Sequence, residues 1–158
     1  MKLSPHQVRA VLGVNEQTLR YWKRIYPELA GRRGYGPCYS FSEVLVLLIT
    51  KRLVDQLGVD VSKLVPMAEA LFAVCRESPR LLANAGEEVW VDIEAMKLTS
   101  QKHDPAPGGR MRIALPLHAL AHELRNRVLS ALGDYEATQM LLPFGPTAIA
   151  PRALRGKA

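Results

Sequence analysis

Residues that start and end helices alternate at short intervals along the opening part of the chain, and this spacing limits what the segment can form. Ser4 and Pro5 suit a helix start, and Gly13 suits the end of that helix. Asn15 is expected to cap a second helix directly afterwards, and Pro27 ends it. The sequence therefore predicts two short helices joined by a tight turn.

A basic loop and a long apolar helix are predicted next. Residues 30–39 contain three glycines and a proline, which exclude a helix and favour a hairpin or wing-like loop. Ser40 and Glu43 form the pattern of a capping box at the start of a helix over about residues 41–57. This helix is apolar almost all round, so we expect it to be the spine of the N-terminal core. A fourth helix is predicted over about residues 60–76.

The second half of the chain has a different pattern. Apolar and polar residues alternate in two segments, which predicts a hairpin that pairs about residues 88–95 with about 110–115. An amphipathic helix is expected from Leu117 to Gly133. Residues 143–158 have the composition of an extended or disordered tail.

Composition narrows the class of protein. The chain has 158 residues and is 48% hydrophobic, which suits a globular protein with a core. No apolar run approaches the roughly 20 residues of a membrane span, and no signal-peptide pattern is present, so we expect a cytoplasmic protein with no membrane partner. Cys38 and Cys75 provide neither a disulfide framework nor the spacing of a zinc site.

The positive charge lies mainly in the opening segment. Residues 1–65 contain ten Lys and Arg against five Asp and Glu, which is a balance of +5 out of the total of +6. A positive field of this kind attracts polyanions and speeds encounter with them. Charge alone is weak support for nucleic-acid binding, because charged segments are usually ordinary solvated surface.

The second helix has a polar face that matches the chemistry of DNA. With Leu19, Trp22 and Ile25 on the core side, helical periodicity predicts that the opposite side presents Gln17, Arg20 and Arg24. Glu16 and Tyr21 are expected at the edges of this face. Arg can pair with guanine and Gln with adenine, and a second Arg or a Tyr can hold a phosphate. On the loop after this helix, Arg32, Arg33 and Tyr35 lie among glycines that allow close approach to a phosphate backbone.

Residues 8–24 (VRAVLGVNEQTLRYWKR) and 31–44 (GRRGYGPCYSFSEV) together resemble the DNA-binding domain of the MerR family of bacterial transcription regulators. The resemblance covers about residues 3–65 and implies a winged helix-turn-helix that binds a near-palindromic site as a homodimer. It implies that Thr18, Arg20 and Tyr21 contact DNA from the recognition helix. It also implies wing contacts by Arg33 and Tyr39.

The chain departs from the family pattern in two places. Pro37 and Cys38 fill the stretch of the wing where the family usually carries an arginine. Pro79, Gly86 and strand-like residues intervene where family members usually have a long dimerisation helix. We therefore expect the domain to bind DNA. For this chain the resemblance does not imply the coiled-coil form of the family's dimer, or the activation by DNA twisting that goes with it.

The interpretation that unites these features is a mainly α protein with a winged helix-turn-helix domain and a small α+β appendage. We predict a DNA-binding domain over residues 1–76, a dimerisation or effector region over 77–142 and a flexible tail over 143–158. The predicted function is transcription regulation on double-stranded DNA in the bacterial nucleoid, as a homodimer, with RNA polymerase or another protein as a further partner. Two alternatives stay open: an excisionase-like or partition-type architectural protein of a mobile element, and a winged-helix module that binds proteins.

Other candidate sites carry less weight, and we expect no enzymatic activity, cofactor or metal. His118 and His122 have the spacing of two zinc ligands on a helix, beside Glu123, but no third ligand is evident. The acidic residues Glu87, Glu88, Asp92 and Glu94 are expected to form a solvated strand face rather than a hydrolase site, with Asp92 and Glu94 on the same side of the strand.

Overall fold

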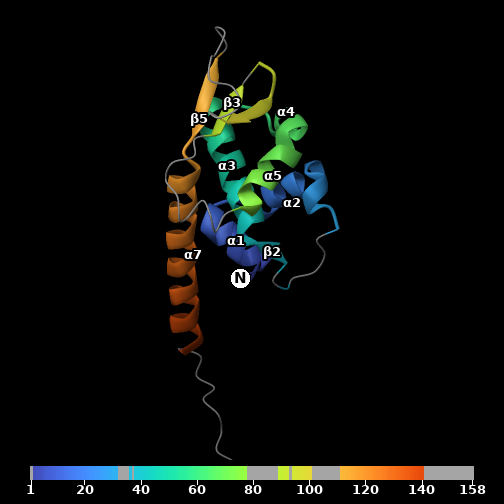
Figure 1. Ribbon diagram of the computed structural model, residues 1–158. Coiled ribbons are helices and arrows are strands. Elements are labelled where there is room, and N and C mark those ends of the chain that lie inside the picture. The colour runs from blue at the N-terminus through green and yellow to red at the C-terminus, as the bar shows by residue number, and fades with distance from the viewer. Residues whose placement is uncertain are drawn as a thin grey trace, which may run out of the picture.

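The chain folds into a group of helices with a three-stranded sheet at one end and a long C-terminal helix along one side (Figure 1). The computed structural model describes residues 2–31, 36, 38–77, 89–92, 94–100 and 111–140. The elements are β1 (Lys2–Leu3), α1 (Pro5–Leu12), α2 (Glu16–Ile25), η1 (Pro27–Leu29), β2 (Tyr39–Ser40), α3 (Phe41–Leu57), α4 (Val61–Leu64), η2 (Val65–Met67), α5 (Ala68–Arg76), β3 (Val89–Asp92), β4 (Lys97–Ser100), β5 (Arg112–Leu115) and α7 (Leu117–Met140).

The helix-turn-helix formed by α1 and α2 has the caps that the sequence predicts. The Ser4 hydroxyl accepts a hydrogen bond from the Gln7 backbone at 3.3 Å, and the Gln7 side chain accepts one from the Ser4 backbone at 2.8 Å. Gly13 ends α1 in the left-handed region with φ 64°. The Asn15 side chain then accepts a hydrogen bond from the Thr18 backbone at 2.7 Å and starts α2. Local side-chain chemistry therefore fixes both ends of the turn.

The helix α3 is the spine of the core, as the sequence predicts. It starts at a capping box in which the Ser40 backbone donates to the Glu43 carboxylate at 2.7 Å. Every residue of α3 from Glu43 to Thr50 is buried. The buried Thr50 hydroxyl is hydrogen-bonded to the Tyr26 hydroxyl at 2.8 Å, which ties the end of α2 to α3. The two small strands β1 and β2 pair antiparallel beside this core.

The predicted single helix over residues 60–76 is wrong in its continuity. Asp60 does cap a helix, but the segment is divided into α4, η2 and α5. Pro66 lies at the break, because proline has no backbone N–H to donate and its ring crowds the preceding turn. The apolar residues still reach the core, since Leu64, Met67 and Leu71 are all buried.

The predicted pairing of the two segments is confirmed, but they do not form a hairpin, because the strand β4 lies between them in the sequence. The strands β3 and β5 pair antiparallel with Val91 opposite Ile113. The additional strand β4 pairs with the other edge of β3, so the sheet order is β4-β3-β5. Short polar segments such as Lys97–Ser100 give little period-two signal, and pairing with β3 decides their conformation.

Asp92 is a correction to the predicted acidic strand face. Its side chain is only 2% exposed and accepts a hydrogen bond from the Ala95 backbone at 2.8 Å in the turn between β3 and β4. Glu94 is exposed in that turn and does not continue the strand. The two carboxylates therefore do not share a solvated strand face, while Glu87 and Glu88 lie outside the described residues.

The C-terminal helix α7 packs along α1 and α3 and continues past Gly133, where the sequence predicts its end, to Met140. Its buried residues join the N-terminal core in one hydrophobic cluster and include Leu117, Leu120, Ala121, Leu124 and Val128. Gly133 lies within the helix and does not adopt the left-handed φ that glycines at helix ends commonly have. The predicted tail over 143–158 lies outside the described residues.

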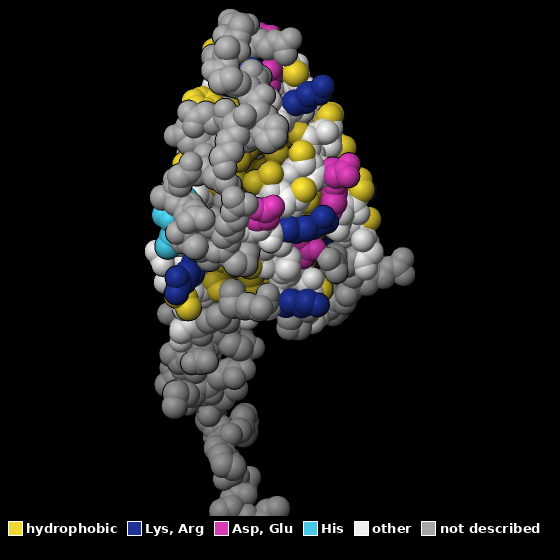
Figure 2. Space-filling model, viewed as in Figure 1, with side chains coloured by type: hydrophobic (Ala, Val, Ile, Leu, Met, Phe, Trp, Pro, Cys, Tyr) yellow, Lys and Arg dark blue, Asp and Glu magenta, His cyan; other side chains and the backbone are white. Residues whose placement is uncertain are grey.

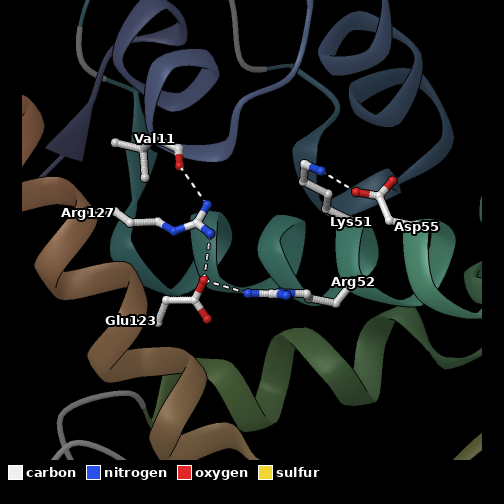
Figure 3. A network of polar contacts seen from close by, with 6 residues as sticks. All are labelled: Val11, Lys51, Arg52, Asp55, Glu123 and Arg127. Carbon is white, nitrogen blue, oxygen red and sulfur yellow. Dashed lines mark hydrogen bonds and ion pairs between the residues drawn. The ribbon is translucent and has the colours of Figure 1, made fainter.

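Polar contacts add to the apolar attachment of α7 (Figure 3). The Glu123 carboxylate accepts a hydrogen bond from Arg52 of α3 at 2.7 Å and forms an ion pair with Arg127 at 2.6 Å. Arg127 also donates to the backbone carbonyl of Val11 at the end of α1, at 3.2 Å. The Glu123 carboxylate therefore connects α7 to α3, and the Arg127 guanidinium connects α7 to α1. None of the described helices combines the length and the apolar character needed to cross a bilayer.

Candidate nucleic-acid interface

The helix α2 is amphipathic and shows its polar side to solvent. Leu19 and Trp22 are 4% and 3% exposed, and they fix the orientation of the helix on the core. The side chains of Gln17, Arg20 and Arg24 are exposed, as the helical periodicity predicts. These groups stand on a short helix that begins immediately after a tight turn, which is the geometry with which a helix-turn-helix presents side chains to a DNA groove.

The polar groups on α2 are organised by contacts with one another. Arg24 lies over the ring of Tyr21, with 5.6 Å between its guanidinium carbon and the ring centroid. Glu16 forms an ion pair with Arg20 at 2.5 Å and a longer one with Arg9 of α1 at 3.7 Å. The exposed face thus carries a partly ordered set of cations and one carboxylate.

Thr18 and Tyr39 differ from the other predicted contacts in their burial. Thr18 is half-buried, in agreement with its position towards the core side of α2. Tyr39 is 1% exposed and lies in β2, opposite Leu3 of β1, where it also lines the hollow between α1 and α2; its predicted contact with DNA stays a prediction. Its buried aromatic ring contributes to the hydrophobic core.

Arg9 and Lys23 are basic residues that the sequence analysis did not include among the candidates. Together with Arg20 they line a surface hollow of about 250 Å³ between α1 and α2. The periodicity of one helix does not show that Arg9 of α1 lies beside Glu16 of α2, because that contact depends on how the two helices pack. Two cations of α2 together with one on α1 are the signal in the sequence for this cluster.

Basic and acidic side chains are interspersed on the face of the molecule drawn in Figure 2, and the described cations there form no patch of their own. The distribution of charge on that face therefore does not identify a DNA-binding surface. The arrangement of α1 and α2 is the feature that indicates one. A comparison with known families decides what kind of unit these helices form.

Residues 3–71 match the model of the MerR HTH family of regulatory proteins. The matched segment runs from β1 into α5 and includes both helices of the turn. It is a MerR-like helix-turn-helix domain, which at the level of the family indicates a DNA-binding transcription regulator. The part of the chain after residue 71 is not recognised. No curated protein matches the chain.

In the wing of the MerR-like domain, the structure describes Gly31, Gly36, Cys38 and Tyr39. Arg32, Arg33 and Tyr35 lie outside the described residues, so their predicted contacts with DNA stay predictions. The base of the wing is anchored, because the Cys38 backbone donates a hydrogen bond to the Leu3 carbonyl at 3.0 Å.

Outside the MerR-like domain, the predicted pair of histidines is adjacent in space. The ring centroids of His118 and His122 are 4.5 Å apart on α7. Within the residues that the structure describes, no group of three or more His, Cys, Asp or Glu comes together as a metal site would require. Cys75 is buried in the core, and this burial raises the pKa of its thiol to about 12. A thiol with so high a pKa is a poor nucleophile and a poor sensor.

Proposed function

We propose that the chain is a sequence-specific transcription regulator that places α2 in the DNA major groove. The observation that carries the proposal is the polar face of α2, where Gln17, Arg20 and Arg24 are exposed opposite the buried Leu19 and Trp22. This face lies within a MerR-like domain. Arg side chains pair with guanine edges and Gln with adenine edges, so the face has the donors and acceptors that base recognition needs.

The remaining parts of the proposal concern how the protein is held on DNA. We propose that Glu16 and Tyr21 stand at the edges of the recognition face and that the wing over residues 31–39 contacts the phosphate backbone through Arg32 and Arg33. Contacts with phosphates set register and orientation, and contacts with base edges give specificity. In this proposal α2 recognises the base sequence, and the wing sets the position of the protein on the DNA backbone.

We further propose that the protein acts as a homodimer in the nucleoid without enzymatic activity, with RNA polymerase or another protein as a partner. Dimeric readers bind two half-sites about one helical turn apart, and the symmetry of the site follows that of the protein.

Selection of bound duplexes from a random pool tests this proposal. We expect enrichment of one motif arranged as two inverted half-sites, because a homodimer reads each half with the same helix. Recovery of a single unpaired motif would contradict the dimer and leave base recognition intact. A pool that stays random would contradict specific recognition altogether.

A titration with variants then assigns the recognition to α2. The Arg24→Ala variant, which removes an exposed arginine of α2, should lose on the order of tenfold in affinity for the selected site, since a good bidentate contact contributes about 1–3 kcal/mol. The matched control is Arg125→Ala, which removes an exposed arginine from α7. Equal losses in the two variants would show that only general charge matters, and the assignment of α2 would then fail.

A further inference from the structure

Among the described residues that line the hollow between α1 and α2, Glu16 is the one acidic side chain. The other lining residues include three cations, Arg9, Arg20 and Lys23. Among the cations, Arg9 belongs to α1, and Arg20 and Lys23 belong to α2. Positive groups from two helices therefore converge on a space in which one carboxylate of the same chain lies.

The Glu16 carboxylate spans the two arginines. Its Oε1 lies 2.5 Å from Nη2 of Arg20, and its Oε2 lies 3.7 Å from Nη1 of Arg9. Each oxygen thus faces a guanidinium from a different helix. A DNA phosphate also offers anionic oxygens to more than one donor, and arginine binds carboxylate and phosphate in the same forked manner.

The contacts of Glu16 are weak enough to be exchanged. The side chains of Arg20 and Glu16 are 76% and 63% exposed. Ion pairs at such exposure are screened by water and contribute little to stability. An external phosphate that enters the hollow can therefore replace the carboxylate without disturbing the fold.

We propose that Glu16 occupies the position of a DNA backbone phosphate between Arg9 and Arg20, and that this carboxylate must leave the hollow when DNA binds. The inference rests on the proposed DNA-binding function and adds Arg9 as a phosphate ligand. Glu16 then acts as an internal competitor that weakens sequence-independent binding. The cost of displacing Glu16 is the same at specific and arbitrary sites, because both need the phosphate contact, and base contacts elsewhere on α2 supply the specificity.

Exchange of one anion for another has a signature in the salt dependence of binding. A protein contact with a phosphate releases counterions from DNA, which gives a slope of log K against log salt of about −0.9 per contact. In the wild-type protein the displaced Glu16 carboxylate is left without its arginines and attracts a cation, which offsets part of that release. Removal of the carboxylate should therefore increase both the affinity for arbitrary DNA and the steepness of the slope.

The experiment compares Glu16→Gln with Asp55→Asn by fluorescence anisotropy on a short labelled duplex of arbitrary sequence, over a range of salt. Asp55 is a matched control because its carboxylate is 52% exposed and also forms an ion pair with a residue four positions away, Lys51. We expect Glu16→Gln to bind several-fold more tightly than wild type, with a slope steeper by up to about 0.9. Asp55→Asn should change the slope little.

A double variant distinguishes an effect of Glu16 within the hollow from an effect of its charge on DNA binding in general. Arg9→Ala should weaken binding, and the Glu16→Gln change should have a smaller effect in the Arg9→Ala background than in wild type. Thermal unfolding of each variant, without DNA, shows whether it is folded. Additive effects of Arg9→Ala and Glu16→Gln on DNA affinity overturn the inference, and so do equal effects of Glu16→Gln and Asp55→Asn. In either case, salt-dependent binding by the wild type leaves the proposed DNA-binding function in place. Absence of salt-dependent binding by the wild type overturns both.

Discussion

Arg52 of α3 and Glu123 of α7 are 71 positions apart in sequence, yet the arginine donates a 2.7 Å hydrogen bond to the carboxylate. Glu123 also pairs with Arg127, which in turn donates to the Val11 carbonyl of α1. The MerR-like domain and the unrecognised C-terminal helix are thereby joined by polar contacts as well as by a shared core. These contacts help to set the position of α7 against α1.

Glu123→Gln is expected to lower the free energy of unfolding by about 1 kcal/mol, because it weakens contacts with two arginines that are partly shielded from water. Urea unfolding measures this change. Asp55→Asn serves as the control, since its ion pair with Lys51 lies within one helix. The prediction is contradicted if both variants lose the same stability.

Leu124→Ala is expected to destabilise the protein by about 3 kcal/mol, because it removes a fully buried side chain from the interface of α7 with the core. Leu129 lies on the same helix but is 57% exposed. Leu129→Ala should therefore change stability by less than about 0.5 kcal/mol. Similar losses in both variants would show that α7 is not packed as described.

Gly13 and Gly133 should respond to alanine with opposite signs. Gly13 has φ +64°, and nothing lies within 4 Å of an added Cβ, so Gly13→Ala should cost about 1 kcal/mol through backbone strain alone. Gly133 lies within α7 without a positive φ and also has open space around it. Gly133→Ala should stabilise by about 0.4–1 kcal/mol, and thermal unfolding of the pair tests both signs.

Stability should fall at high pH through two buried groups. Burial raises the pKa of the Tyr26 hydroxyl from 10.0 to about 12 and that of the Cys75 thiol from 9.0 to about 12. As pH rises, the unfolded state loses these protons before the folded state does. The stability that the two buried groups contribute is therefore fully present below about pH 9 and is lost as pH rises towards 12.

Urea unfolding at several pH values measures this loss, and Cys75→Ala provides the comparison. The variant should keep the loss of stability due to Tyr26, which begins near pH 10. It should not show the loss of stability due to the Cys75 thiol, which begins near pH 9. Unchanged stability of the wild type between these values would argue that neither group is buried in the folded protein.

Much of the candidate site could be predicted because the relevant signals are local. The Asn15 cap and the spacing of Leu19 and Trp22 fix which side of α2 faces the core, and therefore which side shows Arg20 and Arg24. The burial of Tyr39 could not be predicted, because it depends on the pairing of β2 with β1, which no local pattern reveals.

The sequence alone determined the ends and faces of the N-terminal helices, since caps, glycines and helical periodicity act within a few residues. Tertiary structure decided which distant groups meet: Arg9 with Glu16 across the turn, Arg52 with Glu123 across two helices, and β4 with β3 in the sheet. These contacts depend on packing between segments, and the free energy of packing is shared among many residues that no short pattern contains.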